Sequence, residues 1–160
     1  MIFDRFLSML TKSLELLMGT MMITLTAVTF LQVILRYLFN SPTSWSSELS
    51  RFILIWITLT GASVATRRAA HLSMGLSLHR RLPAGAARWL RALINICITG
   101  AMIALCHYGY RIMAVTGGAI SPGLGLPMYV PWSALPVNAA IMCLFLVGDL
   151  LRIFGKRREG

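Results

Sequence analysis

The sequence predicts an all-α integral membrane protein of four transmembrane helices, with both chain ends on the cytoplasmic side. Hydrophobic residues make up 57% of the 160 residues and charged residues only 12%, whereas about a quarter of the residues are charged in a typical soluble domain. The basic residues, moreover, gather in short clusters between long apolar segments, a pattern typical of membrane proteins. At this length we expect a single membrane domain over residues 1–160.

The first predicted span covers residues 14–35, about the twenty residues that a bilayer core requires. Glu15 is its single charged residue and lies at its edge. The alternative is a cleaved signal peptide with Arg5 and Lys12 as its basic region. The apolar segment is longer than a typical signal core and no clear cleavage site follows it. We therefore expect it to be a retained helix.

The second predicted span covers residues 45–66. Its continuous apolar part is short, but a helix that starts near Trp45 is long enough to cross the membrane. This start places Glu48 and Arg51 in the first two turns, near one interface. Small residues such as Gly61 let another helix approach closely.

The third and fourth predicted spans cover residues 88–111 and 131–154. The third helix is expected to begin earlier, near Pro83, because proline is tolerated in a first helical turn. Pro131 and Pro136 fall near the start of the fourth span, where missing backbone donors matter least.

The distribution of basic residues predicts the orientation. Most of them precede the first span, lie between the second and third spans, or follow the fourth span. Cytoplasmic loops carry the excess of Lys and Arg, so the segments 36–45 and 116–131 are expected outside. The residues on the expected cytoplasmic side are Arg5, Lys12, Arg67, Arg68, Arg80, Arg81, Arg88, Arg91, Arg152, Lys156, Arg157 and Arg158.

The sequence gives no indication of an enzyme, of a metal or haem site, or of nucleic-acid binding. The net charge of +10 comes without the aromatic residues or fold motifs of nucleic-acid recognition. His71 and His79 fall at the cytoplasmic edge and His107 toward the other side, so they cannot share one iron. Metal-ligand spacings and catalytic motifs are absent too, and we expect no cofactor.

The positions of the cysteines and carboxylates also give no indication of a reaction centre or an ion relay. The cysteines all lie inside apolar segments, where they act as small hydrophobic residues; they are Cys97, Cys106 and Cys143. Glu15 and Asp149 lie at the ends of spans, and a relay for ions places a carboxylate at mid-membrane. We therefore expect no buried charge that could couple ion movement to transport.

Polar residues are densest at the outer end of the first helical hairpin. Glu48 and Arg51 are three residues apart and share a helix face, and Arg36 could reach Glu48 across the hairpin. One interpretation is an ion-pair clamp at the membrane interface. The other is a docking surface for a partner protein.

The order of these residues resembles the DctQ-like small membrane subunit of tripartite ATP-independent periplasmic (TRAP) transporters, over most of the chain. We take the matching positions as candidates for structural or partner-interface residues. They are Arg36, Tyr37, Asn40, Trp45, Glu48, Arg51, Trp56, Gly61, His71, Pro127 and Pro131. After His71 the sequence reads Leu-Ser-Met-Gly where the family commonly has an acidic residue, which puts an ion pair at that place in doubt.

The resemblance implies a non-catalytic subunit of the bacterial inner membrane. In such transporters a large membrane subunit holds the substrate and sodium sites, and a soluble periplasmic protein delivers the substrate, often an organic acid. The small subunit is implied to act as a scaffold in contact with lipid. We further expect the uncharged, glycine-rich segment 117–125 to pack on the large subunit or to help seat the binding protein.

The alternative is a self-sufficient transporter built as a homodimer of four-helix subunits. Such a carrier needs a membrane-embedded carboxylate that faces the dimer axis. Glu15 is the candidate for this role, although its expected place is close to the membrane edge.

Overall fold

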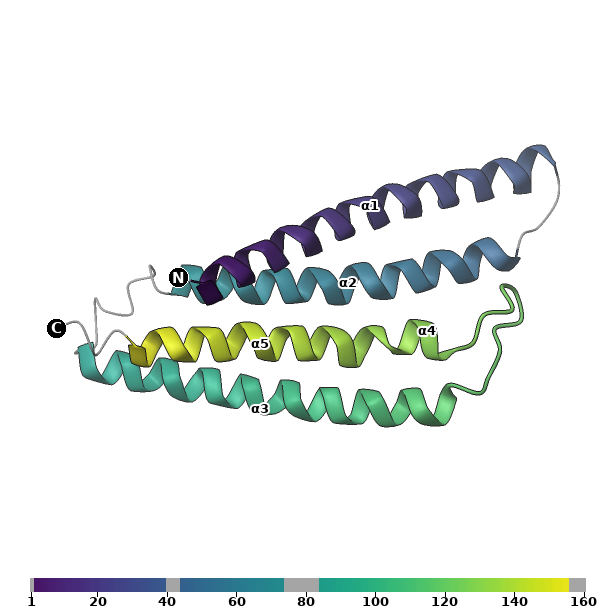
Figure 1. Cartoon of the computed structure of the whole chain (residues 1–160). Helices are drawn as coiled ribbons and strands as arrows, with labels where there is room; N and C mark the ends of the chain where they lie inside the picture. Colours follow the sequence, from purple (N-terminus) through teal and green to yellow (C-terminus); the bar gives the residue numbers. More distant parts are fainter. Residues whose placement is uncertain (1, 40–43, 74–83, 156–160) are drawn as a thin grey trace.

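The computed structural model describes residues 2–39, 44–73 and 84–155, and these residues form helices connected by short segments (Figure 1). The prediction of an all-α fold with four long apolar helices is confirmed, since four helices are long and apolar enough to cross a membrane. Within the described ranges, the β structure is a single isolated bridge between Ile120 and Pro127. The helices are α1 (Ile2–Leu38), α2 (Ser44–Ser73), α3 (Ala84–Thr116), the short α4 (Tyr129–Trp132) and α5 (Ala134–Gly155).

The long helices lie side by side in the order α1, α2, α5, α3 (Figure 1). Both chain ends lie at one end of the bundle, which we call the terminal end. At the opposite end, the loop end, α1 finishes, α2 begins, and the segment 117–128 (the 117–128 loop) leads from α3 to α4. Toward the loop end α1 diverges from α2, so α1 is the least covered helix.

The helices extend beyond the apolar segments that predicted them. Helix α1 already begins at Ile2, well before residue 14, and α2 continues to Ser73, beyond residue 66. Hydropathy marks the part of a helix that lipid can cover, whereas hydrogen bonding continues into the polar ends. Helix α3 begins at Ala84, in agreement with the expected start near Pro83.

The fourth predicted span is interrupted near its start. The structure has one turn of helix, α4, then Ser133 between it and α5. The bonds on either side are present, since the Ser133 N–H donates to Tyr129 and the Val137 N–H donates to Ser133. Pro136, which lies between them, has no backbone N–H and so cannot donate a helical hydrogen bond to the preceding turn. Ser133 keeps helical backbone angles (φ −64°, ψ −20°), and Tyr129–Leu150 forms one candidate membrane span.

The hydrophobic core lies where α1, α2 and α5 meet. It contains Leu7 and Leu14 of α1, Val64 of α2 and Phe145 of α5. Leu7 and Phe145 are completely buried. Large apolar side chains elsewhere on α1 and α3 are exposed, among them Phe30 and Ile103. A bundle with a small core and exposed apolar sides is suited to lipid or to a membrane partner.

Helix α5 is tied to α2 through a buried polar contact. The hydroxyl of Ser63 lies 3.1 Å from the side-chain oxygen of Asn138, and both residues are buried. The Asn138 amide donates in turn to the carbonyl of Ala134 at 2.9 Å. Polar side chains that bond across apolar helices fix their register. Asn138 therefore sets how α5 sits against α2.

Candidate functional site

The carboxylate of Glu48 is the centre of the polar contacts at the loop end. Glu48 lies one turn into α2, and its Oε2 atom accepts a hydrogen bond from the Ser121 hydroxyl. The same oxygen accepts hydrogen bonds from the backbone N–H groups of Gly123 and Leu124, at 3.0 and 3.1 Å. Hydrogen bonds to an ionised carboxylate are stronger than bonds between neutral groups. Glu48 therefore holds the 117–128 loop against α2.

The 117–128 loop has a fixed backbone shape of its own. The Ser121 N–H donates to the carbonyl of Leu126 at 2.8 Å, and the Gly125 N–H donates to the carbonyl of Ser121 at 2.9 Å. Gly125 has a φ of 65°, a conformation that glycine adopts without steric cost. These bonds close the loop and turn its N–H groups toward α2.

Gly123 is required by the closeness of the loop to Glu48. A Cβ atom at Gly123 would lie 2.8 Å from Oε2 of Glu48 and 2.9 Å from its Cδ. Contacts this short are repulsive, so any side chain would displace either the carboxylate or the loop. At Gly118, by contrast, a Cβ would meet nothing within 4 Å. Within one loop, Gly123 is therefore a position where a side chain would clash, and Gly118 is a position where a side chain would fit.

The expected contact between Arg36 and Glu48 is not present in the structure. The guanidinium of Arg36 instead lies 6.0 Å from the ring centroid of its neighbour Tyr37, and both side chains are exposed. Arg51 is exposed and forms no ion pair with Glu48 within 4.0 Å in the described chain. The carboxylate is satisfied by the 117–128 loop, which supplies three donors where the hairpin would supply one.

The other candidate residues are dispersed over the molecule. Trp45 is exposed and Trp56 half-buried on α2, and Pro131 is buried in α4. A Cβ at Gly61 would lie 3.4 Å from Sδ of Met18 on α1, an ordinary contact. Pro127 pairs with Ile120 in the 117–128 loop. Asn40 and the side chain of His71 lie outside the described part of the structure. These residues do not form one site.

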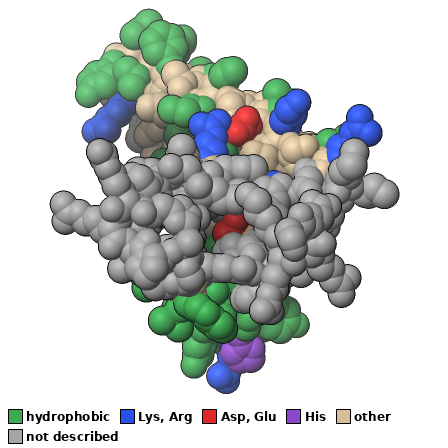
Figure 2. All heavy atoms as spheres, turned by 90° about the vertical axis from the view of Figure 1, so that its left-hand side faces the viewer, with side chains coloured by type: hydrophobic (Ala, Val, Ile, Leu, Met, Phe, Trp, Pro, Cys, Tyr) green, Lys and Arg blue, Asp and Glu red, His purple; other side chains and the backbone are tan. Residues whose placement is uncertain are grey.

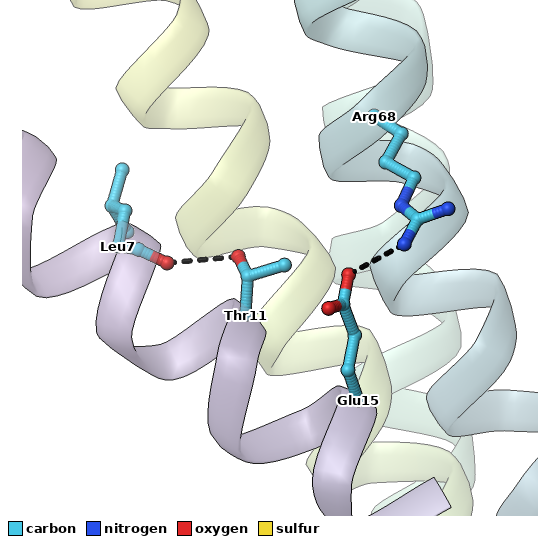
Figure 3. A network of polar contacts seen from close by, with 4 residues as sticks. All are labelled: Leu7, Thr11, Glu15 and Arg68. Carbon is cyan, nitrogen blue, oxygen red and sulfur yellow. Dashed lines mark hydrogen bonds and ion pairs between the residues drawn. The ribbon is translucent and has the colours of Figure 1, made fainter. Parts of the chain in front are cut away.

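Glu15, the carboxylate of the homodimer alternative, is paired within its own chain. The Arg68 guanidinium donates to it at 2.8 Å, and Figure 3 shows the two side chains extending toward each other from α1 and α2. Thr11, one turn earlier on α1, donates to the carbonyl of Leu7. Figure 2 shows basic side chains gathered over this half of the terminal end, with an acidic side chain among them. The pairing does not favour a dimer-axis role.

A buried polar cluster at the terminal end was not expected from the sequence. Asp149 of α5 is 6% exposed and accepts a hydrogen bond from the Asn95 amide of α3 at 3.0 Å. Arg67 of α2 is 4% exposed, and its guanidinium lies 5.8 Å from the ring centroid of Phe145. Asp149 lies near the end of α5, where the sequence placed it, but its burial against Asn95 was not predicted. Asn95, a lone amide within an apolar segment, was the available signal.

The arrangement has the character of a framework rather than of a reaction centre. In the described ranges, no group of three His, Cys, Asp or Glu residues is placed to hold a metal ion. The cysteines, Cys97, Cys106 and Cys143, are all free thiols. His107 is exposed and stacks edge-on against Tyr108. The polar groups that do converge join one helix to another or a loop to a helix.

The chain is similar to a family of membrane transport components. Residues 25–156 match the family model described as the DctQ component of tripartite ATP-independent periplasmic transporters. A TRAP transporter small permease protein of Haemophilus influenzae is 30% identical over 142 residues, which cover 89% of this chain and 82% of the relative. The matched range includes Glu48 and the whole 117–128 loop.

Two further relatives are much longer proteins. The sialic acid TRAP transporter permease protein SiaT of Haemophilus influenzae is 26% identical over 133 residues, or 83% of this chain and 21% of the relative. The isethionate TRAP transporter permease protein DctMQ of Oleidesulfovibrio alaskensis is 28% identical over 108 residues, or 66% of this chain and 17% of the relative. The chain thus spans about a fifth of each of these two permeases.

Proposed function

Because the chain belongs to the DctQ family, the small membrane subunits of TRAP transporters, we propose that it scaffolds a large membrane subunit during ion-coupled uptake of an organic acid. The resemblance seen in the sequence is confirmed at the level of the family. With four apolar helices, the chain is a multi-pass protein of the bacterial inner membrane.

The observation that carries the partnership with a large subunit is the length of the relatives. In SiaT and DctMQ, the segment similar to this chain makes up only 21% and 17% of the polypeptide. Joining two segments in one chain fixes their ratio at one to one and keeps them together. The same arrangement between separate chains calls for a stable interface. The exposed apolar side chains of α1 and α3 offer surface for such an interface.

The scaffold role is supported by how the helices are tied together. Helix α5 is bonded to α2 through Asn138 and to α3 through Asp149. Contacts from one helix to both neighbours oppose sliding of the helices against each other. A subunit of this kind can hold its shape while its partner moves.

The substrate and the coupling ion belong to the proposal as well. The two longer relatives are named for sialic acid and for isethionate, both of which are acids, so we propose an organic acid for this transporter. Their identities to this chain are nearly equal, at 26% and 28%. Overall similarity of this subunit therefore does not select the substrate. We propose sodium as the coupling ion and a periplasmic binding protein as the source of substrate.

Co-purification from native membranes tests the proposal. The chain carries an affinity tag, the membranes are dissolved in mild detergent, and the recovered proteins are identified and quantified by mass spectrometry. We expect one large polytopic subunit in about equal molar amount. Recovery of the chain alone, as a dimer, would contradict the scaffold role and favour a self-sufficient carrier.

Transport by the reconstituted complex tests the coupling. Liposomes that contain both membrane subunits receive the binding protein and a labelled organic acid on the outside. We expect uptake with an inward sodium gradient, and none when this chain is omitted. Equal uptake without the chain would contradict the proposal, because the large subunit would then need no scaffold.

A further inference from the structure

We propose that Glu48 is the positioning residue of a docking surface for the soluble binding protein, formed by the 117–128 loop and the start of α4. The complementary surface on the binding protein would be an apolar patch with acidic residues around it. This inference rests on the proposed function and on the predicted orientation, which puts the loop end outside the cytoplasm.

The docking surface consists of exposed apolar side chains. Ile120 is 70% exposed and Leu126 40% exposed, and they lie in the loop; Tyr129 and Trp132 are 49% and 41% exposed and belong to α4. Aromatic and large aliphatic residues are the usual anchors of protein interfaces. Ile120 and Leu126 lie in the loop itself, whereas Tyr129 and Trp132 stand at the start of the candidate membrane span Tyr129–Leu150, where aromatic residues lie at the membrane surface.

The surroundings of this surface are basic. Glu48 is the single carboxylate of the sequence between Glu15 and Asp149, and its Oε2 atom is taken up by the loop. The described charged side chains that remain at the loop end are exposed arginines; they are Arg36, Arg51 and Arg111. Basic residues on this side do not serve orientation, since that signal lies in cytoplasmic loops. Charge complementarity therefore favours an acidic rim on the partner.

The position of the loop residues favours a protein partner over lipid chains. Ile120 and Leu126 lie after the end of α3 at Thr116 and before α4 begins at Tyr129. They are thus beyond the helices that are long enough to cross the membrane. Contact with lipid chains does not account for their exposure. A protein that approaches from the aqueous phase would meet them first.

Glu48 determines the shape in which this surface is presented. One oxygen of its carboxylate collects three donors from the loop, and Gly123 leaves no space for a side chain between them. A loop fixed in its binding shape loses less conformational entropy when a partner binds. Without the carboxylate the loop would have to be ordered during docking, and affinity would fall.

The test measures the affinity of the binding protein for the membrane complex. The chain and its large subunit are placed together in nanodiscs, and the dissociation constant of the purified binding protein is measured for wild type, Glu48→Gln and Gly123→Ala. We expect both variants to bind about ten-fold more weakly, as for a docking hot spot. Gly123→Ala keeps the carboxylate but displaces the loop, so it tests the geometry if Glu48→Gln lowers the yield of complex.

One control variant separates docking from general damage, and one further variant tests the charge of the docking surface. Gly118→Ala adds the same methyl group where nothing lies within 4 Å, and it should bind as wild type does. Arg51→Gln leaves the loop contacts intact and should weaken the dependence of binding on salt, because screening acts on exposed charges.

Several outcomes would overturn the inference. Wild-type affinity in both Glu48→Gln and Gly123→Ala would show that loop shape does not matter for docking. If the binding did not depend on salt, the surface of the binding protein would not have the proposed acidic residues. Equal binding of the binding protein to empty nanodiscs and to nanodiscs that contain the complex would show that lipid headgroups, and not the 117–128 loop, hold it. Failure of the wild-type subunits to assemble at all would instead contradict the proposed function.

Discussion

Glu48 and Asp149 show how position gives the same chemical group two different roles. Glu48 lies near a helix end, where the loop can reach it, and two loop N–H groups and the Ser121 hydroxyl donate to a single oxygen. Asp149 is surrounded by helices and accepts from the Asn95 amide, while its Oδ1 atom has no partner among the described atoms. A buried carboxylate with few donors is costly, so its one partner matters greatly.

Asn95→Ala should therefore destabilise the protein. The substitution leaves the Asp149 carboxylate buried without the amide, at a cost of about 1–3 kcal/mol for loss of a bond to a charged group. Thermal unfolding in detergent measures this for Asn95→Ala, Asp149→Ala and the double variant. The double variant should lose less than the sum of the two single losses. Strictly additive losses would show that the two side chains do not interact.

Glu15→Gln should have little effect. The ion pair with Arg68 lies at the surface, with side-chain exposures of 67% for Arg68 and 36% for Glu15, and exposed pairs contribute less than about 1 kcal/mol. We expect an unchanged melting temperature and unchanged uptake by the assembled complex. A loss of uptake at normal stability would make Glu15 a transport residue and revive the homodimeric carrier.

At the scale of elements, α3 and α5 approach each other closely at Gly109. A Cβ atom at Gly109 of α3 would lie 3.1 Å from Cγ of Leu135 and 3.2 Å from Cδ of Pro136. The thiol of Cys106, one turn earlier, lies 3.6 Å from the carbonyl of Pro136. Small residues at such crossings allow close packing where lipid offers no hydrophobic drive. Gly109 of α3 therefore lies against the first turn of α5, next to the break between α4 and α5.

Gly109→Leu should separate these helices. Overpacking of a tight contact costs about 1–3 kcal/mol, and we expect a lower melting temperature in detergent. Gly100→Leu is the matched control on the same helix, since a Cβ there meets nothing within 4 Å. Equal effects of the two substitutions would mean that the loss comes from the helix itself and not from the contact with α5.

At the scale of the whole molecule, α2 and α5 are the inner helices of the bundle and α1 and α3 the outer ones. Helix α5 contacts both α2 and α3, whereas α1 packs on α2 and reaches α5 through the core at the terminal end. Helix α1 begins and α5 ends at that end (Figure 1), as expected for an even number of crossings. The arrangement leaves one side of α1 and one side of α3 for lipid or for the large subunit.

The predicted orientation can be tested with fusions to the C-terminus. The excess of basic residues predicts that this end lies in the cytoplasm. Green fluorescent protein fused there should be fluorescent, and alkaline phosphatase fused there should be inactive because it folds only in the periplasm. The opposite pattern would reverse the orientation, and it would also put the 117–128 loop out of reach of a periplasmic binding protein.

The sequence by itself determined the class of fold. Apolar segments of sufficient length must form helices in lipid, because every backbone polar group needs an internal partner. Four such segments therefore predicted four long helices without knowledge of any contact. The order of residues from Arg36 to Arg51, and from Pro127 to Pro131, also placed the chain in its family, as the match over residues 25–156 confirms.

The contacts that define the candidate site were decided by the tertiary structure. Glu48 and Ser121 are far apart in sequence, and spacing along one helix pointed instead to Arg36 and Arg51. The burial of Asp149 depends on which faces of α3 and α5 meet, and hydropathy does not specify faces in a segment that is apolar all round. Helix formation is local, whereas the partner of a carboxylate is set by how the whole bundle packs.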